Sequence, residues 1–391
     1  MTTASTLLIL GGSARAAAWS AARAGFQPFA GDFFADQDLH ECCPVELVKK
    51  YPRDLLEVSR RSPPGDWLYT GGLENHPRLV DAIAAERRLL GNPGDVLRRV
   101  RNPFDVAAAL SRCGITCPAL AASAHGLPRD GTWLCKLRRS SGGQGIFPWD
   151  QTRQSGILPT RPKSNSRRNY FQERIDGLPC AAAYVAASGK ARLLGITQQL
   201  IGTPWCGAQP FAYAGSIGPF PTNDRQLLQW ERIGSALAEE FKLVGLFGVD
   251  AVLHQDSVWP IEVNPRYTAS LEVLERTLGL QTVALHVAAC SQGILPAAIV
   301  PAGHGRYSGK AVVYAQVNGT VNEFLAKAFA GLKGAAAWPQ LADIPRIGSG
   351  IVRGWPICTV LADGTSPTEV EQRLQSDSGK ILELLEAAAN R

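Results

Sequence analysis

Apolar and polar positions alternate in short blocks over the first hundred residues. Residues 6–10 (TLLIL) form an apolar run that is typical of a buried strand, and the alanine-rich stretch 14–24 predicts a helix. Residues 26–30 and 67–70 predict two further strands, and residues 78–90 predict a helix with one apolar face. Strands and helices in alternation favour a small parallel-sheet unit, so we expect an α/β (α+β) chain.

Longer strands are predicted after residue 100. Residues 181–187 and 191–200 flank Ser188-Gly189-Lys190, which is a typical hairpin pattern. A β-rich segment begins near residue 305, and residues 367–389 predict a closing helix. The remaining predictions are helices at 105–112 and 226–241, and strands at 132–136, 170–175, 245–253 and 258–263. The polar stretch 150–169 predicts a loop.

Composition excludes several classes of protein. Apolar residues make up 45% of the 391 residues and charged residues 19%, which rules out a mainly disordered chain. The net charge is only +6 and like charges form short blocks, so nothing favours a nucleic-acid partner. No segment reaches the ~18–20 apolar residues of a membrane span. Nine cysteines without a CxxC pair favour reduced thiols in a cytoplasmic protein.

Two glycine-rich turns follow predicted strands. Gly11-Gly12-Ser13 does not fit GxGxxG, so we interpret it as a tight turn between strand and helix. Asp32, Glu74 and Asn75 also lie at strand ends, where they form either a pocket or ordinary loops. The stretch 138–146 follows Lys136 and suits either phosphate binding or a surface loop.

Acidic and amide side chains gather on the strand pair 245–253 and 258–263. Glu262 and Asn264 are two residues apart, so they share one face of a strand. Asp250 lies on the neighbouring predicted strand, and the three side chains could converge. Carboxylate and amide oxygens suit Mg²⁺, which usually completes its shell from phosphates and water. A metal site is therefore predicted here, with Arg266 beside it.

Taken together, these motifs resemble the ATP-grasp superfamily, and more narrowly its branch near biotin carboxylase. The resemblance rests on the order of the Lys136 loop, the QERI strand at 172–175 and the IEVNPR segment at 261–266. It implies an N-terminal α/β domain at 1–98, an ATP-grasp domain at 99–300 and a small β-rich domain at 301–391.

The resemblance also implies a role for each motif. Asp250, Glu262 and Asn264 would hold one or two Mg²⁺ or Mn²⁺ ions, and Arg266 and Asn264 would act on the transferring phosphate. ATP would contact the phosphate-binding residues Lys136, Ser141, Gly142, Gly143 and Gly145, the hinge residues Gln172, Glu173, Arg174 and Ile175, and Gln198.

The sequence departs from that family at two points. Arg101 stands where most members carry a lysine, so either Arg101 replaces that nucleotide contact or the contact is absent. Tyr267-Thr268-Ala269-Ser270 stands where carboxylases carry a Gln-Val-Glu run, which argues against biotin carboxylation.

The implied activity is ATP-dependent ligation of a small-molecule carboxylate to an amine through an acyl phosphate, with release of ADP and phosphate. Family members that add glutamate make this amino acid a candidate substrate. Biotin-carboxylase-like carboxylation, a non-catalytic nucleotide-binding protein and a dinucleotide oxidoreductase remain as alternatives, and a homodimer stays open.

Overall fold

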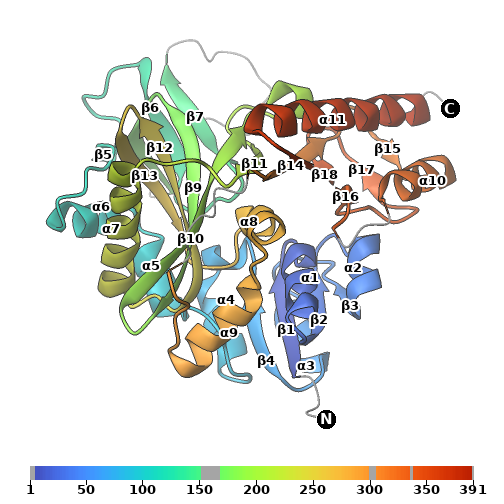
Figure 1. Ribbon diagram of the computed structural model, residues 1–391, viewed down its shortest axis with the longest axis horizontal. Helices are drawn as coiled ribbons and strands as arrows, with labels where there is room; N and C mark the ends of the chain where they lie inside the picture. The colour runs from blue at the N-terminus through green and yellow to red at the C-terminus, as the bar shows by residue number, and fades with distance from the viewer. Residues whose placement is uncertain (1–4, 151–167, 299–304, 335–337, 390–391) are drawn as a thin grey trace.

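The computed structural model describes residues 5–150, 168–298, 305–334 and 338–389. Nearly all of the predicted loop 150–169 lies outside these residues. Figure 1 shows the N-terminal unit in blue, the central sheets in green and yellow, and the C-terminal unit in orange and red. All nine cysteines lie within the described residues, and none of them forms a disulfide. Within the described ranges, no helix combines the length and apolar character that a membrane crossing requires.

A four-stranded parallel sheet forms the N-terminal unit, with strand order β3-β2-β1-β4. Its strands are β1 (Thr6–Gly11), β2 (Gln27–Asp32), β3 (Val45–Leu47) and β4 (Asp66–Tyr69). Its helices are α1 (Arg15–Arg23), α2 (Gln37–Cys42), α3 (Leu55–Arg61), η1 (Leu73–Asn75), α4 (Pro77–Ala84) and α5 (Gly94–Val100).

The helix predicted over 78–90 is too long, because α4 ends at Ala84. The chain then turns back toward the sheet. Leu90 donates its backbone N–H to the Trp67 carbonyl at 2.7 Å, and Trp67 donates to the Arg88 carbonyl at 3.0 Å. Pairing with β4 therefore competes with the helix for residues 88–90 and ends it early.

A small antiparallel sheet follows α6 (Pro103–Arg112), with strand order β5-β8-β6-β7. Its strands are β5 (Leu120–Ala121), β6 (Asp130–Leu137), β7 (Ile146–Asp150) and β8 (Asn169–Glu173). The Asn102 side chain caps α6, and Pro103 occupies its first turn, where a missing N–H costs nothing.

An eight-stranded antiparallel sheet forms the centre, with order β13-β12-β9-β10-β11-β14-β18-β16. Its strands are β9 (Leu178–Ala187), β10 (Lys190–Ile201), β11 (Tyr213–Gly218), β12 (Gly245–His254), β13 (Ser257–Asn264), β14 (Tyr307–Tyr314), β16 (Leu341–Ala342) and β18 (Pro356–Gly364). This sheet crosses the predicted boundary at residue 300, so the C-terminal unit extends the central sheet.

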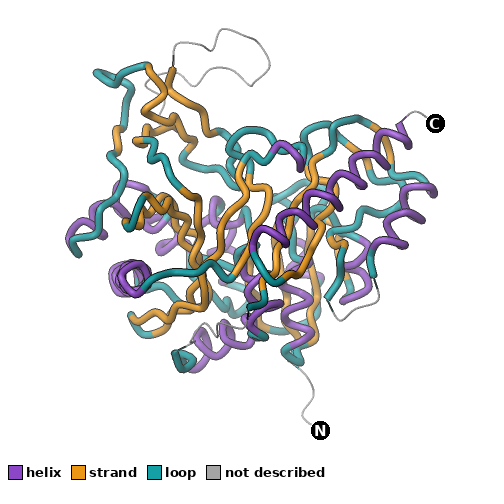
Figure 2. Tube along the Cα trace, turned by 45° about the horizontal axis from the view of Figure 1, so that its top comes forward, coloured by secondary structure: helices purple, strands orange, loops and turns teal. Residues whose placement is uncertain are grey.

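The remaining elements cover this sheet. They are η2 (Pro204–Cys206), α7 (Asp224–Phe241), α8 (Ser270–Leu278), α9 (Thr282–Gln292), α10 (Glu323–Leu332), α11 (Pro367–Ala389) and the pair β15 (Gly319–Thr320) and β17 (Gly350–Ile351). Figure 2 shows the long helix α11 running across the C-terminal strands, and it packs on β14 and β18. Asn223 and Gln226 form a capping box at the start of α7.

Candidate functional site

A cavity of about 460 Å³ opens between the small sheet and the end of the large one. Strands β6 and β8 supply one wall, and β12 and β13 supply another. Most of the residues singled out in the sequence line this cavity: Lys136, Ser141, Gly142, Gly143, Gln172, Glu173, Arg174, Ile175, Asp250, Glu262, Asn264 and Arg266. The fold thus brings residues from four strands, and from the segments that follow three of them, to a single place.

Asp250 and Glu262 are direct partners across the antiparallel pair β12–β13. Asn264 Nδ2 donates to Asp250 Oδ2 at 2.9 Å, and Gln199 Nε2 donates to Asp250 Oδ1 at 3.0 Å. Burial and the nearby negative charge of Glu262 raise the pKa of Asp250 to about 6. A divalent cation would offset both the cost of burying Asp250 and its repulsion from Glu262, so these two carboxylates fit a metal site.

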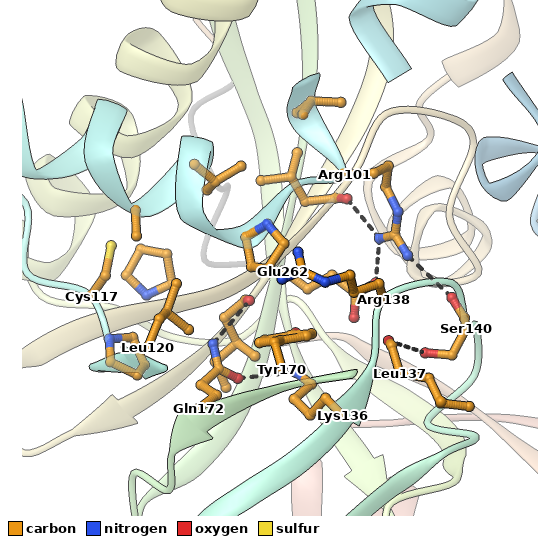
Figure 3. Close-up of a pocket in the computed structure, with 18 residues that line it drawn as sticks. Arg101, Cys117, Leu120, Lys136, Leu137, Arg138, Ser140, Tyr170, Gln172 and Glu262 are labelled. Carbon is orange, nitrogen blue, oxygen red and sulfur yellow. Dashed lines mark hydrogen bonds and ion pairs between the residues drawn. The ribbon is translucent and has the colours of Figure 1, made fainter. Parts of the chain in front are cut away.

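Glu262 lies between two cations, Arg101 and Lys136. Figure 3 shows Arg101 directed at Glu262 and at the loop that carries Ser140. The Arg101 guanidinium pairs with the Glu262 carboxylate and also donates to the carbonyls of Val263 and Ser140, each at 3.1 Å. Burial alone would raise the pKa of Glu262, but the charges of Arg101 and Lys136 lower it below its ordinary value.

Lys136 is a buried cation at the wall of the cavity. Its side chain is 4% exposed, and Nζ donates to Gln172 Oε1 at 3.0 Å. Gln172 in turn donates toward the Ile261 carbonyl on β13 at 3.5 Å. A buried ammonium is costly unless anions are close by, and Glu262 is shared with Arg101, so this position favours a further anionic ligand such as phosphate.

The glycine-rich loop rests on the segment that leads into β11. Tyr213 donates its backbone N–H to the Gly142 carbonyl at 3.1 Å. Gly143 has φ +80°, and a Cβ built there would lie 1.7 Å from the Phe211 carbonyl oxygen. Only glycine therefore allows this close approach, which brings the loop against the cavity.

Arg266 extends the polar network toward the N-terminal unit. Its Nε donates to Glu74 Oε1 at 2.9 Å, and its Nη2 donates to Asn264 Oδ1 at 3.3 Å. Glu74 is 2% exposed, so its charge is fixed against Arg266. Hydrogen bonds thus connect the acidic strand pair to η1, which follows β4.

Residues 100–270 match the family of ATP-grasp domains. This chain contains an ATP-grasp domain. The match spans the small sheet, the cavity and strands β9 to β13, together with the start of α8. No protein of curated function matches the sequence as a relative.

Solved structures share the fold of the whole chain. An L-amino acid ligase from Bacillus licheniformis is 16% identical with a TM-score of 0.68, over 97% of this chain and 98% of that one. The biotin carboxylase domain of a Hydrogenobacter thermophilus 2-oxoglutarate carboxylase, determined with MgADP and bicarbonate, is 12% identical with a TM-score of 0.69, over 94% and 88%. A Thermus thermophilus N5-carboxyaminoimidazole ribonucleotide synthetase is 12% identical with a TM-score of 0.67, over 96% and 98%.

Three of the residues expected to bind nucleotide do not line the large cavity of the ATP-grasp domain: Arg101, Gly145 and Gln198. Successive side chains on a strand point to opposite faces, and it is Gln199 that contacts Asp250. No pattern in the sequence indicates which of the two glutamines faces the cavity. Gly145 fits closely against the Leu137 side chain, and Arg101 lines a smaller cavity behind Glu262.

Other expectations for the ATP-grasp domain are refined in the same way. Glu173, expected at the adenine, accepts the backbone N–H of Ala119 at 3.0 Å while lining the cavity. Sequence analysis missed the contributions of Gln199, Tyr213 and Thr268 to the lining, since none carries a motif.

The Gly11-Gly12-Ser13 turn serves the packing of the parallel sheet. A Cβ at Gly11 would lie 1.8 Å from Thr70 Oγ1, and Gly12 donates its N–H to the Gly71 carbonyl at 3.1 Å. Gly11 is therefore required by the close approach of Thr70, which follows β4, to the end of β1, and this agrees with the interpretation as a tight turn.

Metal binding in the ATP-grasp domain would rest on a mixed ligand set. Among the described residues, no group of three or more His, Cys, Asp and Glu side chains is arranged for a metal ion. Two carboxylates and one carboxamide nevertheless fit Mg²⁺, which takes its remaining oxygens from phosphates and water. The ordered contacts of Asp250 with Gln199 and Asn264 hold one of these carboxylates in place.

Proposed function

We propose that this protein is an ATP-dependent carboxylate–amine ligase that works through an acyl phosphate and releases ADP and phosphate. The observation that carries this proposal is the convergence in one cavity of Lys136, the pair Asp250 and Glu262, and Arg266. The shared fold with an L-amino acid ligase over nearly the whole of both chains supports it.

The side chains suit the binding of Mg·ATP. Asp250, Glu262 and Asn264 would hold one or two Mg²⁺ ions, which would neutralise charge on the transferring phosphate. Lys136 would place a positive charge against phosphate oxygens from a position that water barely reaches. The hinge after β8, with Glu173, Arg174 and Ile175, would receive the adenine.

The reaction needs position and charge rather than a nucleophile from the protein. The substrate carboxylate attacks the γ-phosphorus, the bond to the bridging oxygen breaks, and ADP leaves. The amine then attacks the acyl carbon and phosphate leaves. Arg266 would orient the carboxylate and stabilise the acyl phosphate, because its guanidinium is held by Glu74 at the edge of the metal site.

Water must be kept from an acyl phosphate, since hydrolysis would waste it. The loop of Ser141, Gly142 and Gly143 already lies against the segment 211–213 and lines the cavity. We propose that this loop closes over bound nucleotide.

The experiment is ADP release by the purified protein with Mg·ATP. The protein is supplied with pools of amino acids that include L-glutamate, with small carboxylates, or with bicarbonate. Release that requires both a carboxylate and an amine is expected. Release with bicarbonate alone would replace ligation by carboxylation, and bound ATP without release in any pool would contradict an enzymatic function.

A further inference from the structure

Four aromatic side chains form a continuous cluster between the N-terminal and C-terminal units. This aromatic seam consists of Phe33, Phe34, Tyr51 and Trp355. The ring of Phe33 lies 5.0 Å from Phe34, 6.0 Å from Tyr51 and 6.3 Å from Trp355, measured between centroids. Figure 1 shows the blue and red units side by side, so residues more than 300 positions apart meet here.

A buried carboxylate builds the turn that presents the two phenylalanines. Asp32 is fully buried at the end of β2, and its Oδ1 accepts the backbone N–H groups of Phe34 and Ala35, each at 2.7 Å. Its Oδ2 accepts the N–H of Ala14 at the start of α1. Hydrogen bonds from the backbone to the Asp32 carboxylate thus hold this turn against the sheet. The turn therefore does not depend on the packing of the aromatic rings.

The opposite side of the seam is also anchored. Trp355 donates its backbone N–H to the Val352 carbonyl at 2.9 Å and accepts from the Ala315 N–H at 2.9 Å. Even so, 51% of Trp355 and 37% of Phe34 remain exposed. Aromatic side chains that stay partly exposed on an anchored backbone are suited to contact with a ligand or partner.

The Gly71-Gly72 turn lies between the seam and Arg266. Tyr51 lies at its inner end, and its hydroxyl approaches the Gly71 carbonyl at 3.4 Å. A Cβ at Gly72 would lie 2.3 Å from that hydroxyl, so glycine makes room for the tyrosine. A Cβ at Gly71 would in turn lie 3.5 Å from the Arg266 guanidinium carbon. One short glycine turn therefore separates the aromatic rings from the cation at the metal site.

A cation at one end and aromatic rings at the other match a molecule with the same two features. We propose that the carboxylate substrate carries an aromatic side chain, which stacks on the aromatic seam while its carboxylate lies at Arg266. This inference rests on the ligase function proposed above, and it adds the chemical class of the acid. The aromatic seam would set the specificity for the side chain of the acid, and Arg266 would hold its reacting carboxylate.

The test compares L-phenylalanine with L-alanine, which differ by one phenyl ring. Binding is measured by calorimetry with Mg²⁺ and a non-hydrolysable ATP analogue, and ADP release is measured with a pool of amino acids as amines. Wild-type protein should bind phenylalanine at least about tenfold more tightly than alanine, the scale of one buried aromatic contact.

Three variants distinguish the loss of aromatic stacking from the loss of any exposed apolar side chain. Trp355→Ala should weaken phenylalanine binding and raise its KM by about tenfold, with kcat and the KM of ATP little changed. Trp355→Phe should recover most of the loss. Leu228→Ala removes an exposed apolar side chain on α7 and should leave every value unchanged.

The two proposals can fail separately. ADP release that favours alanine or glutamate, and that Trp355→Ala leaves unchanged, would overturn the aromatic subsite and keep the ligase. Tight binding of phenylalanine without ADP release in any pool would overturn the ligase and keep the subsite. A change of oligomeric state in Trp355→Ala, with unaltered binding, would make the seam a protein interface and overturn the inference.

Discussion

Glu262 is the side chain on which the charge balance of the cavity and the proposed metal binding both depend. The substitution Glu262→Gln removes the negative charge of a proposed metal ligand and almost no volume. ADP release should fall by about a hundredfold or more, since even an outer-shell partner of a metal ligand costs ~10–100-fold. The fold should persist, because Arg101 keeps its bonds to the Val263 and Ser140 carbonyls.

Steady-state ADP release and thermal unfolding, measured on the same preparation, check this expectation. Glu369→Gln on α11 is the matched control, because this carboxylate is remote from the cavity and serves only a surface turn and ion pair. Full activity in Glu262→Gln would refute its assignment as a metal ligand.

Gly143 tests the glycine-rich loop. Gly143→Ala should raise the KM of Mg·ATP by roughly tenfold, because its Cβ would meet the Phe211 carbonyl and displace the loop. Gly126→Ala is the control, because Gly126 also has a positive φ, +75°, and nothing lies within 4 Å of a Cβ built there. Equal effects of the two variants would show that backbone strain, and not contact with the cavity wall, explains the loss.

Only some of the residues that line the cavity could be predicted from the sequence. Glu262 and Asn264 were predicted to share a face because a strand has a period of two, and both line the cavity. The same rule could not show whether Gln198 or Gln199 faces the cavity, because no neighbouring residue indicates which side chains of β10 point to which face of the sheet. Arg101 pairs with Glu262, which lies 161 residues away in the sequence, so no local pattern could predict this contact.

At the scale of elements, a buried histidine joins α9 to the central sheet. His286 Nδ1 accepts the Leu246 backbone N–H at 2.8 Å, and Nε2 lies 3.0 Å from the Leu90 carbonyl. The ring must then be neutral and carry its proton on Nε2. Burial lowers the pKa of His286 to about 4.

This lowered pKa predicts a loss of stability in acid. The contribution of His286 is fully present above pH 6.5, its unfolded value, and is lost as the pH falls through about 4. A shift of this size corresponds to about 3 kcal/mol in the free energy of unfolding. Urea unfolding of wild type and His286→Gln at several pH values measures it. The difference between them should shrink from pH 7 to pH 4, and a constant difference would contradict the assignment.

Elements were predicted best where start signals and periodicity agree. The closing helix was predicted at 367–389, as α11 has it, because Pro367 suits a first turn and apolar positions recur along it. Short elements such as α2, β3 and β16 have too few residues to show a period. The helix at 78–90 failed because pairing with β4 decided its end, and that pairing is tertiary.

For the whole molecule, a buried ion cluster connects three parts of the chain. Arg15 on α1 donates to Glu272 on α8 at 3.0 Å and to Asp343 at 3.0 Å. Lys310 on β14 donates to the same Glu272 at 2.7 Å. Burial alone would raise the pKa of Glu272, but Arg15 and Lys310 hold it well below its ordinary range.

Arg15→Met should therefore destabilise the protein by about 3 kcal/mol or more, because buried carboxylates lose their counter-charge. Arg60→Met is the control, since Arg60 pairs with Glu57 and Glu86 at the surface and should change stability little. Chemical denaturation measures both. Equal stability of the two variants would show that the cluster does not hold the units together.

The arrangement of units was only partly predictable. Motifs in a fixed order led to the ATP-grasp fold, but the division at residue 300 followed a change of pattern along the chain. Hydrogen bonds between β11 and β14 cross that division and make one sheet. Such pairing depends on residues nearly a hundred positions apart, which hydrophobic periodicity does not record.

Transfer of oxygen from the acid to phosphate decides whether the reaction passes through an acyl phosphate. The protein is supplied with Mg·ATP and amino acids labelled with ¹⁸O in their carboxylates, and the phosphate released is analysed by mass spectrometry. Attack by the carboxylate predicts one ¹⁸O atom in each phosphate formed with the product. Phosphate free of ¹⁸O, formed while the product accumulates, would contradict the proposed ligase mechanism.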